Sequence, residues 1–477
     1  MHRIVLVLLV MVARPCLASE PCVERGRSLL AGAAAVNITP EHFPVSMTGS
    51  FQDRQATSAH DPLHARAIVL DDGKTRLAIV VCDSCLIARE TFDNAKADAA
   101  QATGIPIENM LMSATHTHSA ATAVPMANCR PDRRYLAYLE KQIAQAVVQA
   151  WANLEPATLG WAVKQEPSEV SVRRWKMKPG AIEENPFGKR TDKVKMNPPR
   201  GSKDLIEPAG PIDPDVSILS IRSSSGRPIA LLANYSLHYV GGTPVGQLSA
   251  DYFGEFAKRI GAKLDADEVD PPFVGIMSNG TSGDVNNYNF IKPRPAAAPF
   301  ERINAVAEKI ADVAFAAHNS IQHKSDVSLA MAEQEIEVAI RQPDDSDSQW
   351  ARDILRDHDG RALRDMTEVY ANEALVLGRH PGSVKIKLQA LRIGSFGITA
   401  NPCESFAQVG LDIKQQSPYK LTMNIGLANG YSGYLPTPEQ HELGGYETWP
   451  SRWSFLEVNA SRKITETITE LLKEVSP

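Results

Sequence analysis

The sequence predicts a single large α/β domain, with helices around a mixed β-sheet core and long loops that line a site. Two observations predict the fold. Apolar, β-branched runs alternate with helical stretches along most of the 477 residues. Residues 133–154 repeat apolar side chains at every fourth position, which is typical of an amphipathic helix packed on a core. Polar clusters also follow several apolar runs, at the strand ends where such folds place their sites.

The first half of the chain alternates the two kinds of element in a regular order. A turn from Asp71 to Lys74, between two apolar runs, predicts a β-hairpin. The expected strands lie at residues 29–37, 66–70, 76–82, 107–112, 216–221, 228–237 and 273–277. The expected helices lie at residues 88–101, 133–154, 250–262 and 302–317.

The second half continues this alternation. Strands are expected at 326–340, 384–400 (a pair that turns at Gly394) and 421–427, with helices in 348–378, 405–415 and 454–474. Residues 176–214 hold many Pro, Gly, Lys and Asp residues and show little periodicity. We interpret this segment as an irregular loop insert over a site, and not as a linker between domains.

The amino terminus has the pattern of an export signal. A positive start is followed by an apolar run at residues 4–13 and by small residues that end near Ser19. We therefore expect residues 1–19 to be a signal peptide and residues 20–477 to be one domain without a transmembrane segment. The expected location is secreted or periplasmic. The net charge of −6 argues against nucleic acid as the main partner.

Five cysteines follow the expected signal, and an odd number leaves at least one thiol free. The spacing of Cys82 and Cys85 suits a redox or zinc pair, but no second such pair exists for a structural zinc site. The apolar run before Cys82 favours buried thiols. Whether the two residues pair stays open at this point.

A His-x-His motif follows the expected strand at 107–112. In an extended segment, the side chains of His116 and His118 project to the same side. Two adjacent imidazoles suit a divalent metal, or one metal ligand and one proton carrier. Taken alone, the motif is equally compatible with two ordinary surface or core histidines.

Four polar clusters end apolar runs in this way. They lie at residues 116–118, 234–238, 401–404 and 429–434. Each has an ordinary explanation alone: His238 as a strand-end histidine, Glu404 as a charge at a helix N-terminus, and Tyr434 as a rim aromatic. Their occurrence together in equivalent settings favours a metal site.

These motifs resemble those of the neutral (alkaline, non-lysosomal) ceramidase family, which are zinc amidases that hydrolyse the N-acyl bond of ceramide. The matching segments are residues 114–119, 234–238, 278–284 and 431–434, together with Tyr446–Glu447. The resemblance spans roughly residues 30–450, and is most specific in the Thr-His-Thr-His-Ser motif and the two tyrosines twelve positions apart.

The resemblance implies a ligand set and catalytic residues. Zinc would be held by His116, His238, Glu404 and Tyr434. His118 and Tyr446 would act beside the metal, together with an arginine of the pair Arg173–Arg174. We assign that role to Arg173, and the choice within the pair stays open.

Elementary chemistry agrees with this assignment. Two imidazoles and a carboxylate form a common catalytic zinc set that leaves a position for water. The expected reaction is attack of a zinc-activated water on an amide carbonyl. Tyr446 and Arg173 would help to stabilise the oxyanion, and His118 would carry the proton to the leaving amine.

The sequence departs from the family pattern in three places. Asn286 stands where the family usually has a serine that is important for activity, so a serine nucleophile at this position is excluded. Residues 120–123 replace a glycine-rich stretch, so we expect a different pocket rim. The chain ends at Pro477 after one helix, so we expect no C-terminal β-sandwich domain.

Two functions therefore compete. The first is a secreted zinc-dependent amidohydrolase that acts on a ceramide-like N-acyl lipid. The second is a non-catalytic metal-binding or ligand-binding protein on the same scaffold. Asn286 favours the second function, whereas the presence of His118 and Tyr446 favours the first, because a binding protein has no need of them.

Overall fold

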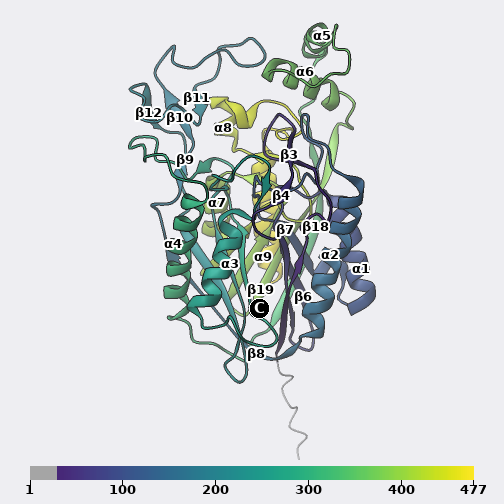
Figure 1. The fold of residues 1–477 in the computed structure, drawn as a ribbon, viewed down its shortest axis with the longest axis vertical. Helices are drawn as coiled ribbons and strands as arrows, with labels where there is room; N and C mark the ends of the chain where they lie inside the picture. Colours follow the sequence, from purple (N-terminus) through teal and green to yellow (C-terminus); the bar gives the residue numbers. More distant parts are fainter. Residues whose placement is uncertain (1–28) are drawn as a thin grey trace, which may run out of the picture.

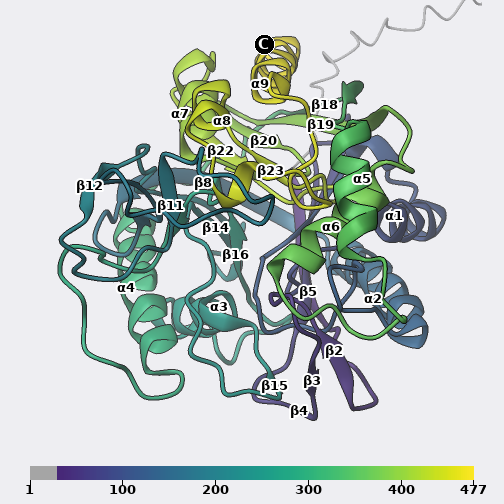
Figure 2. The ribbon, with the colours of Figure 1, turned by 90° about the horizontal axis from the view of Figure 1, so that it is seen from above.

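The computed structural model describes residues 29–477 (Figure 1). The expected signal peptide, residues 1–19, lies outside the described residues. The described chain is layered as helix, sheet, sheet and helix, with many of its loops gathered at one end (Figures 1 and 2). Within residues 29–477, no helix has both the length and the apolar character needed to span a bilayer.

The larger sheet has eight strands and is mixed, as the sequence predicts. Its spatial order is β16 (Val274–Asn279), β14 (Pro228–Tyr235), β13 (Asp215–Ser223), β8 (Glu155–Gln165), β1 (Leu30–Asn37), β5 (His64–Asp71), β6 (Arg76–Cys82) and β7 (Met110–Ala114). The pairs β14–β16 and β6–β7 are parallel, and the other neighbours are antiparallel. The expected hairpin is the β5–β6 pair, in which Asp71 lies opposite Arg76.

A second sheet packs on the first, which the sequence analysis did not foresee. It consists of β18 (Leu329–Ala339), β19 (Ser383–Ile393), β20 (Phe396–Ala400) and β22 (Leu421–Ile425), in that order. One buried apolar cluster joins the two sheets, with Ile68 and Leu219 from the first and Leu391 and Met423 from the second. One layer of the core therefore lies between the two sheets, and further layers lie between each sheet and its helices.

Helices cover the outer faces of both sheets. On the larger sheet lie α1 (Arg89–Thr103), α2 (Arg133–Ala152), α3 (Asp251–Lys263) and α4 (Glu301–His318), and on the smaller sheet lie α7 (Ala407–Gln416) and α9 (Ala460–Glu474). The predicted helix at 133–154 is confirmed as α2, which buries Leu139, Ile143 and Val147. The last helix begins at Ala460 and not at Ser454, because Leu456 is engaged in a β-bridge to Ile340.

Short elements gather at the end of the molecule that carries the loops (Figure 1). The interpretation of residues 176–214 as wholly irregular is wrong, because β11 (Val194–Met196) and β12 (Leu205–Pro208) flank β10 (Arg174–Met177) in a small sheet. Trp175, Met177 and Phe290 give this sheet a small apolar cluster of its own. Two helices from the second half, α5 (Asp345–Ile354) and α6 (Met366–Leu377), lie at the same end.

The tips of three parallel strands are bonded to one another at this end. Asn279 is the last residue of β16 and donates from Nδ2 to the carbonyl of Thr115, just after β7, at 2.9 Å. The segment after β22 lies between them: the Leu427 carbonyl accepts from Ala114, and the Gly426 N–H donates to the Asn279 carbonyl. These contacts bring residues far apart in the sequence to one place, as expected for the carboxyl ends of parallel strands.

A buried lysine, Lys96, stabilises the contact between these strand ends. Lys96 of α1 is fully buried, and its Nζ donates to Asn429 Oδ1 at 2.8 Å. Asn429 in turn donates from its backbone to the Met112 carbonyl and from Nδ2 to Gln389 Oε1. Lys96 therefore links α1 to the loop after β22. Burial lowers the pKa of the Lys96 ammonium to about 8.

This lowered pKa predicts a pH-dependent stability. Between pH 8 and the ordinary lysine pKa of 10.5, the unfolded chain keeps the Lys96 proton while the folded chain loses it. The free energy of unfolding should therefore gain on the order of 3 kcal/mol from this group as the pH rises through that interval. Lys96→Met should lack that gain in urea unfolding at pH 8 and 10.5, whereas the exposed control Lys141→Met should keep it. An identical pH dependence in Lys96→Met would contradict the prediction.

Candidate metal centre

Backbone contacts with the end of β6 position the first imidazole of the site, that of His116. After β7 ends at Ala114, the N–H groups of Thr115 and His116 donate to the carbonyls of Cys82 and Ser84, both at 2.9 Å. His116 has a φ of 73°, a conformation that is unusual for a residue other than glycine and that concentrates at functional sites. Its Nδ1 lies 3.0 Å from the carbonyl oxygen of Cys85. That contact assigns the ring proton to Nδ1 and leaves Nε2 with a free lone pair.

The second imidazole is fixed in the same manner by a different loop. His238 follows β14, and its Nδ1 lies 2.9 Å from the carbonyl oxygen of Ser282, in the loop after β16. The Ser282 hydroxyl donates to Asn279 Oδ1 at 2.7 Å, so this side chain braces the loop. Nε2 of His238 is again the nitrogen left free by the backbone contact.

A short parallel pair of strands brings in the carboxylate. In it, β21 (Glu404–Ser405) runs beside β23 (Tyr434–Leu435), and Glu404 lies directly opposite Tyr434. Glu404 Oε2 lies 3.1 Å from His116 Nε2, and Oε1 accepts from the Tyr431 hydroxyl at 2.9 Å. The loop after β16 packs tightly here, because a Cβ atom at Gly283 would lie 2.3 Å from the Glu404 carbonyl oxygen.

These three side chains suit a metal ion. One ligand atom each from His116, His238 and Glu404 can be chosen so that all three lie within 4.8 Å of one another, and all three residues are buried. Glu404 Oε2 is buried, and among the described residues it has no partner other than the His116 ring nitrogen that would bind the ion. Two nitrogens and a carboxylate oxygen are donors that zinc accepts readily. In metal-binding histidines, the ring nitrogen that does not bind the metal typically contacts a carbonyl oxygen, as Nδ1 of His116 and His238 does here.

The electrostatics of His116 and Glu404 also favour a positive charge between these two side chains. Burial opposes protonation of His116, but the Glu404 carboxylate outweighs it and raises the pKa of His116 well above its usual value. The carboxylate thus attracts a proton to the place where a cation would bind. A metal ion would replace that proton, since metal binding releases protons from its ligands.

A second group of possible ligands shares His116. Cys85, His116 and His118 also have donor atoms within 4.8 Å of one another. The Cys85 thiol, however, lies 3.7 Å from Nδ1 of His116, the nitrogen that already faces the Cys85 carbonyl. The set with His238 and Glu404 is therefore the better one, because it uses the Nε2 atoms, which the backbone carbonyls of Cys85 and Ser282 leave available.

His118 lies at the edge of the centre. Its Nε2 is 3.2 Å from Nε2 of His116, and its ring stacks on Tyr239 with the centroids 3.8 Å apart. Burial lowers the pKa of His118 well below its usual value, and the charges on His116 and Arg173 lower it further. The ring is therefore neutral near pH 7.

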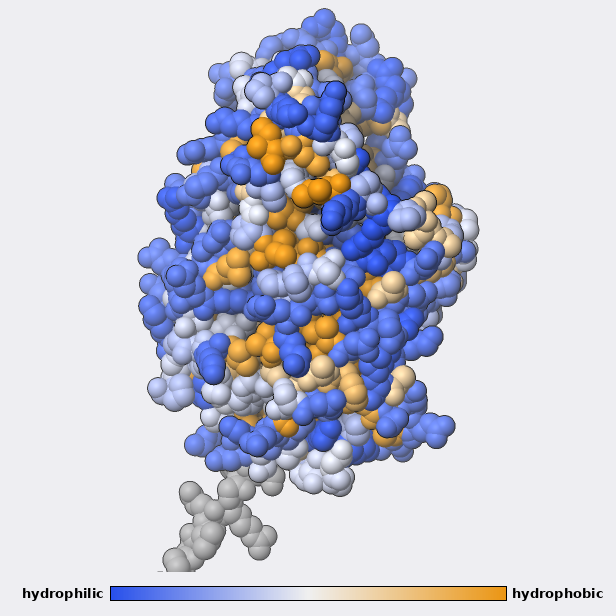
Figure 3. All heavy atoms as spheres, turned by 90° about the vertical axis from the view of Figure 1, so that its left-hand side faces the viewer, coloured by the Kyte–Doolittle hydropathy of each residue, from blue (hydrophilic) through white to orange (hydrophobic). Residues whose placement is uncertain are grey.

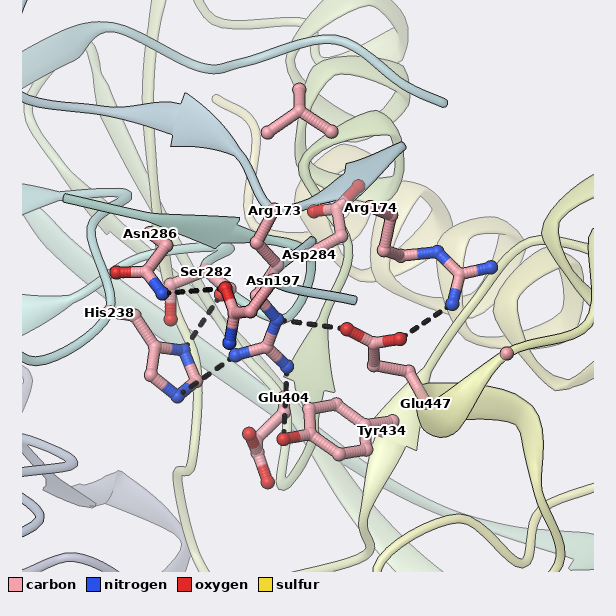
Figure 4. Close-up of polar contacts among 12 residues, drawn as sticks. Arg173, Arg174, Asn197, His238, Ser282, Asp284, Asn286, Glu404, Tyr434 and Glu447 are labelled. Carbon is pink, nitrogen blue, oxygen red and sulfur yellow. Dashed lines mark hydrogen bonds and ion pairs between the residues drawn. The ribbon is translucent and has the colours of Figure 1, made fainter. Parts of the chain in front are cut away.

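Arg173, and not Arg174, reaches the candidate centre (Figure 4). Its Nη2 donates to the Tyr434 hydroxyl at 3.1 Å, and its Nη1 lies 3.3 Å from Nε2 of His238. Arg174 points away from the centre, with Nη2 donating to the Gly444 carbonyl at 2.7 Å. Of the two arginines that the sequence left open, only Arg173 contacts the candidate centre, and its catalytic role stays a prediction.

One buried carboxylate holds both arginines. Glu447 has no exposed surface, and its two oxygens pair with Nε of Arg173 at 2.9 Å and with Nη1 of Arg174 at 2.6 Å. Figure 4 shows Glu447 between the two guanidinium groups. The sequence motif includes Glu447, but the sequence predicted no function for it. Two adjacent buried arginines nevertheless require a counter-ion, and Glu447 is that counter-ion.

An apolar cavity opens onto the candidate centre. Its wall includes His116, His118, Glu404 and Tyr434. The rest of the wall is largely apolar and includes Phe51, Leu86, Met126, Tyr446 and Trp453. The ring centroid of Tyr446 lies 5.9 Å from that of Tyr434, so the two tyrosines line the same side. The structure thus brings all seven predicted site residues into one region.

Sequence reasoning missed several residues of the site. Tyr239 follows His238 directly and could have been noticed as an aromatic beside a candidate ligand. Cys85 acts through its backbone carbonyl, which no side-chain pattern reveals, and its thiol is free and buried, as is that of Cys82. Asn286, where a serine was expected, donates from Nδ2 to Asn197 Oδ1 at 2.9 Å.

The ion cluster predicts a large cost for loss of Glu447. In Glu447→Gln, the guanidinium groups of Arg173 and Arg174 would stay buried without their shared carboxylate. We expect the free energy of unfolding to fall by about 3–5 kcal/mol in urea titrations. The control Glu439→Gln removes an exposed carboxylate that pairs with Arg462, and should cost less than about 1 kcal/mol. A loss as small as that of the control would mean that the cluster contributes little.

Comparison with known proteins identifies the family of this chain. Residues 29–293, more than half of the sequence, match the family described as neutral/alkaline non-lysosomal ceramidase, N-terminal. The match includes His116, His118, Arg173 and His238, whereas Glu404, Tyr434 and Tyr446 lie beyond it. No curated protein matches the chain.

Solved structures share the fold. The neutral ceramidase from Pseudomonas aeruginosa superposes with a TM-score of 0.67 at 18% identity, over 93% of this chain and 74% of that one. A structure described as ceramidase complexed with C2 gives a TM-score of 0.66 at 17% identity, over 94% and 76%. Family and fold together support a ceramidase-like hydrolase. This chain belongs to the neutral/alkaline non-lysosomal ceramidase family.

Proposed function

We propose that this chain is a zinc-dependent amidohydrolase that cleaves the N-acyl bond of a ceramide-like lipid. The observation that carries the proposal is the convergence of His116, His238 and Glu404, of which His116 and Glu404 line a largely apolar cavity. A polar centre of this kind suits the amide, and the apolar wall suits an acyl chain. With the amino-terminal export pattern, the proposal places the protein outside the cytoplasm, secreted or periplasmic.

In this proposal, His116, His238 and Glu404 hold the zinc ion, and Tyr434 lies beside them as a fourth ligand. Bound zinc supplies a water whose pKa falls to about 7 and polarises a carbonyl oxygen. The protein residues orient the ligands and shape the cavity. The Cys85 and Ser282 carbonyls keep the ligand nitrogens directed at the centre, and the cavity wall excludes bulk water from the amide.

His118 carries the proton. Its Nε2 faces the centre, 3.2 Å from Nε2 of His116, and a neutral imidazole can take a proton from water and give it to the leaving amine. The Arg173 guanidinium and the Tyr446 hydroxyl donate to the amide oxygen as its negative charge develops. Glu447 keeps Arg173 in place for that contact.

Metal analysis tests the ligand set. The purified protein should contain about one zinc ion per chain, measured by plasma mass spectrometry after dialysis. Glu404→Gln and His238→Ala should each lower zinc affinity by at least about tenfold, because each removes one of three main ligands. His323→Gln serves as the control and should keep the metal, because His323 contacts Ser220 of β13 and belongs to neither group of possible ligands. Full zinc affinity in Glu404→Gln would contradict the assignment of that ligand.

Turnover tests the role of His118. With a panel of N-acyl-sphingosines of different chain length, His118→Ala should lose about 10²- to 10⁴-fold in rate while its zinc content stays near that of the unmodified protein. Loss of the metal in this variant would instead make His118 a ligand. Zinc without hydrolysis of any amide or ester by the unmodified protein would favour the non-catalytic binding protein.

A further inference from the structure

A second hollow lies beside the candidate centre and is lined by arginines. Its charged lining residues are Arg200, Arg294 and Arg302, and the residues that line it include no carboxylate. We call this hollow the arginine pocket. Its cavity volume is about 260 Å³, which has room for a phosphate or sulfate group.

The positive charges of the pocket are only partly balanced. Arg302 and Lys309 pair with Glu169, a carboxylate that is 5% exposed, and Arg294 Nη1 lies 3.6 Å from the same carboxylate. One buried carboxylate thus serves three cations. Arg200 has no carboxylate within ion-pair distance in the part of the chain that the structure describes.

Two other carboxylates lie nearby and are already engaged. Glu166 is 3.8 Å from Lys309, and Glu301 accepts the N–H of Ala298 at the start of α4. Neither of them lines the hollow. The space enclosed by the three arginines is therefore positive, and a bound anion would meet no acidic side chain there.

Neutral partners hold the guanidinium groups in place. Arg200 lies over the ring of Tyr288, 4.1 Å from its centroid, and Arg302 Nε donates to Asn287 Oδ1 at 2.8 Å. Arg294 donates to the Ser168 carbonyl at 3.1 Å. Aromatic and amide contacts orient a guanidinium without cancelling its charge, which leaves it ready for an oxyanion.

The surroundings suggest where such an anion comes from. Val245 and Ile291 are 83% and 65% exposed, and each lies within three residues of a residue that lines the pocket. Figure 3 shows the side of the molecule that carries α4 and β12, where apolar patches lie among hydrophilic side chains. Exposed apolar side chains beside cations are typical of proteins that meet an anionic lipid surface.

The pocket adjoins the candidate centre through one aromatic residue. Val240 and Gly241 line the pocket, and the preceding Tyr239 stacks on the ring of His118. On the other side, Asn287 lines the pocket next to Asn286. The pocket is therefore connected to the candidate centre through the segment that carries Tyr239.

We propose that the arginine pocket binds a phosphate or sulfate group, either on a lipid headgroup or on a free anion. Arginine guanidinium groups match such oxyanions in charge and geometry, with two parallel N–H donors each. The site is separate from the metal ligands, so the proposal holds whether or not the centre hydrolyses an amide.

Calorimetric titration with inorganic phosphate at low ionic strength tests the proposal on the full chain. The unmodified protein should bind phosphate, and Arg200→Gln and Arg200→Gln/Arg294→Gln should bind it at least about tenfold more weakly. Arg134→Gln, a 78% exposed side chain on α2, is the matched control and should bind as the unmodified protein does. Zinc content and urea midpoints, which report on the centre and the fold, should stay unchanged in all three variants.

Co-sedimentation with vesicles separates the two sources of the anion. Binding to phosphatidylglycerol vesicles but not to phosphatidylcholine vesicles, lost in the double variant, assigns the site to a lipid headgroup. Phosphate binding without vesicle binding assigns it to a free or small anionic ligand. Absence of phosphate binding, or equal binding by the double variant and the unmodified protein, would overturn the proposal. Neither result would bear on amide hydrolysis, which the zinc and turnover assays measure separately.

Discussion

Two backbone carbonyls orient the candidate centre on which the functional interpretation depends. The carbonyls of Cys85 and Ser282 each face the Nδ1 atom of an imidazole, and so direct Nε2 of His116 and His238 toward the carboxylate of Glu404. Neither carbonyl comes from the strand that carries its histidine. The geometry therefore requires that the tips of β6, β7, β14 and β16 are held together. The contacts of Asn279, Leu427 and Gly426 provide that attachment.

Around this centre, the protein buries an unusual amount of charge. Arg173 and Arg174 share Glu447, and Glu404 faces His116, all in surroundings from which water is largely excluded. Such groups are costly to bury and persist only when each finds a partner. The arrangement contributes less to stability than to position, because every charged group near the cavity is held by a specific neighbour. Polar groups that are fixed before the substrate binds need little reorganisation during a reaction.

Much of this could be read from the sequence, and the failures have physical causes. Strand and helix positions follow from periodicity, and the β5–β6 hairpin follows from the turn at residues 71–74. The pairing of strands into two sheets was not readable, because apolar runs such as 384–393 fit either sheet equally well. The strands within residues 176–214 were missed because β11 and β12 are only three and four residues long and depend on pairing with β10. Among site residues, side-chain types pointed to the candidate ligands, but backbone groups such as the Cys85 carbonyl cannot be recognised in a residue pattern.

The close approach at Gly283 has a consequence for comparing sequences. The peptide there passes so near the Glu404 carbonyl that a β-carbon would force the two loops apart. The spacing between the carboxylate and the loop that orients His238 is thus set by the absence of a side chain. Position 283 can therefore serve as a diagnostic marker: among distant homologues, replacement of this glycine would distinguish chains that keep only the architecture from those in which the candidate ligands can still meet.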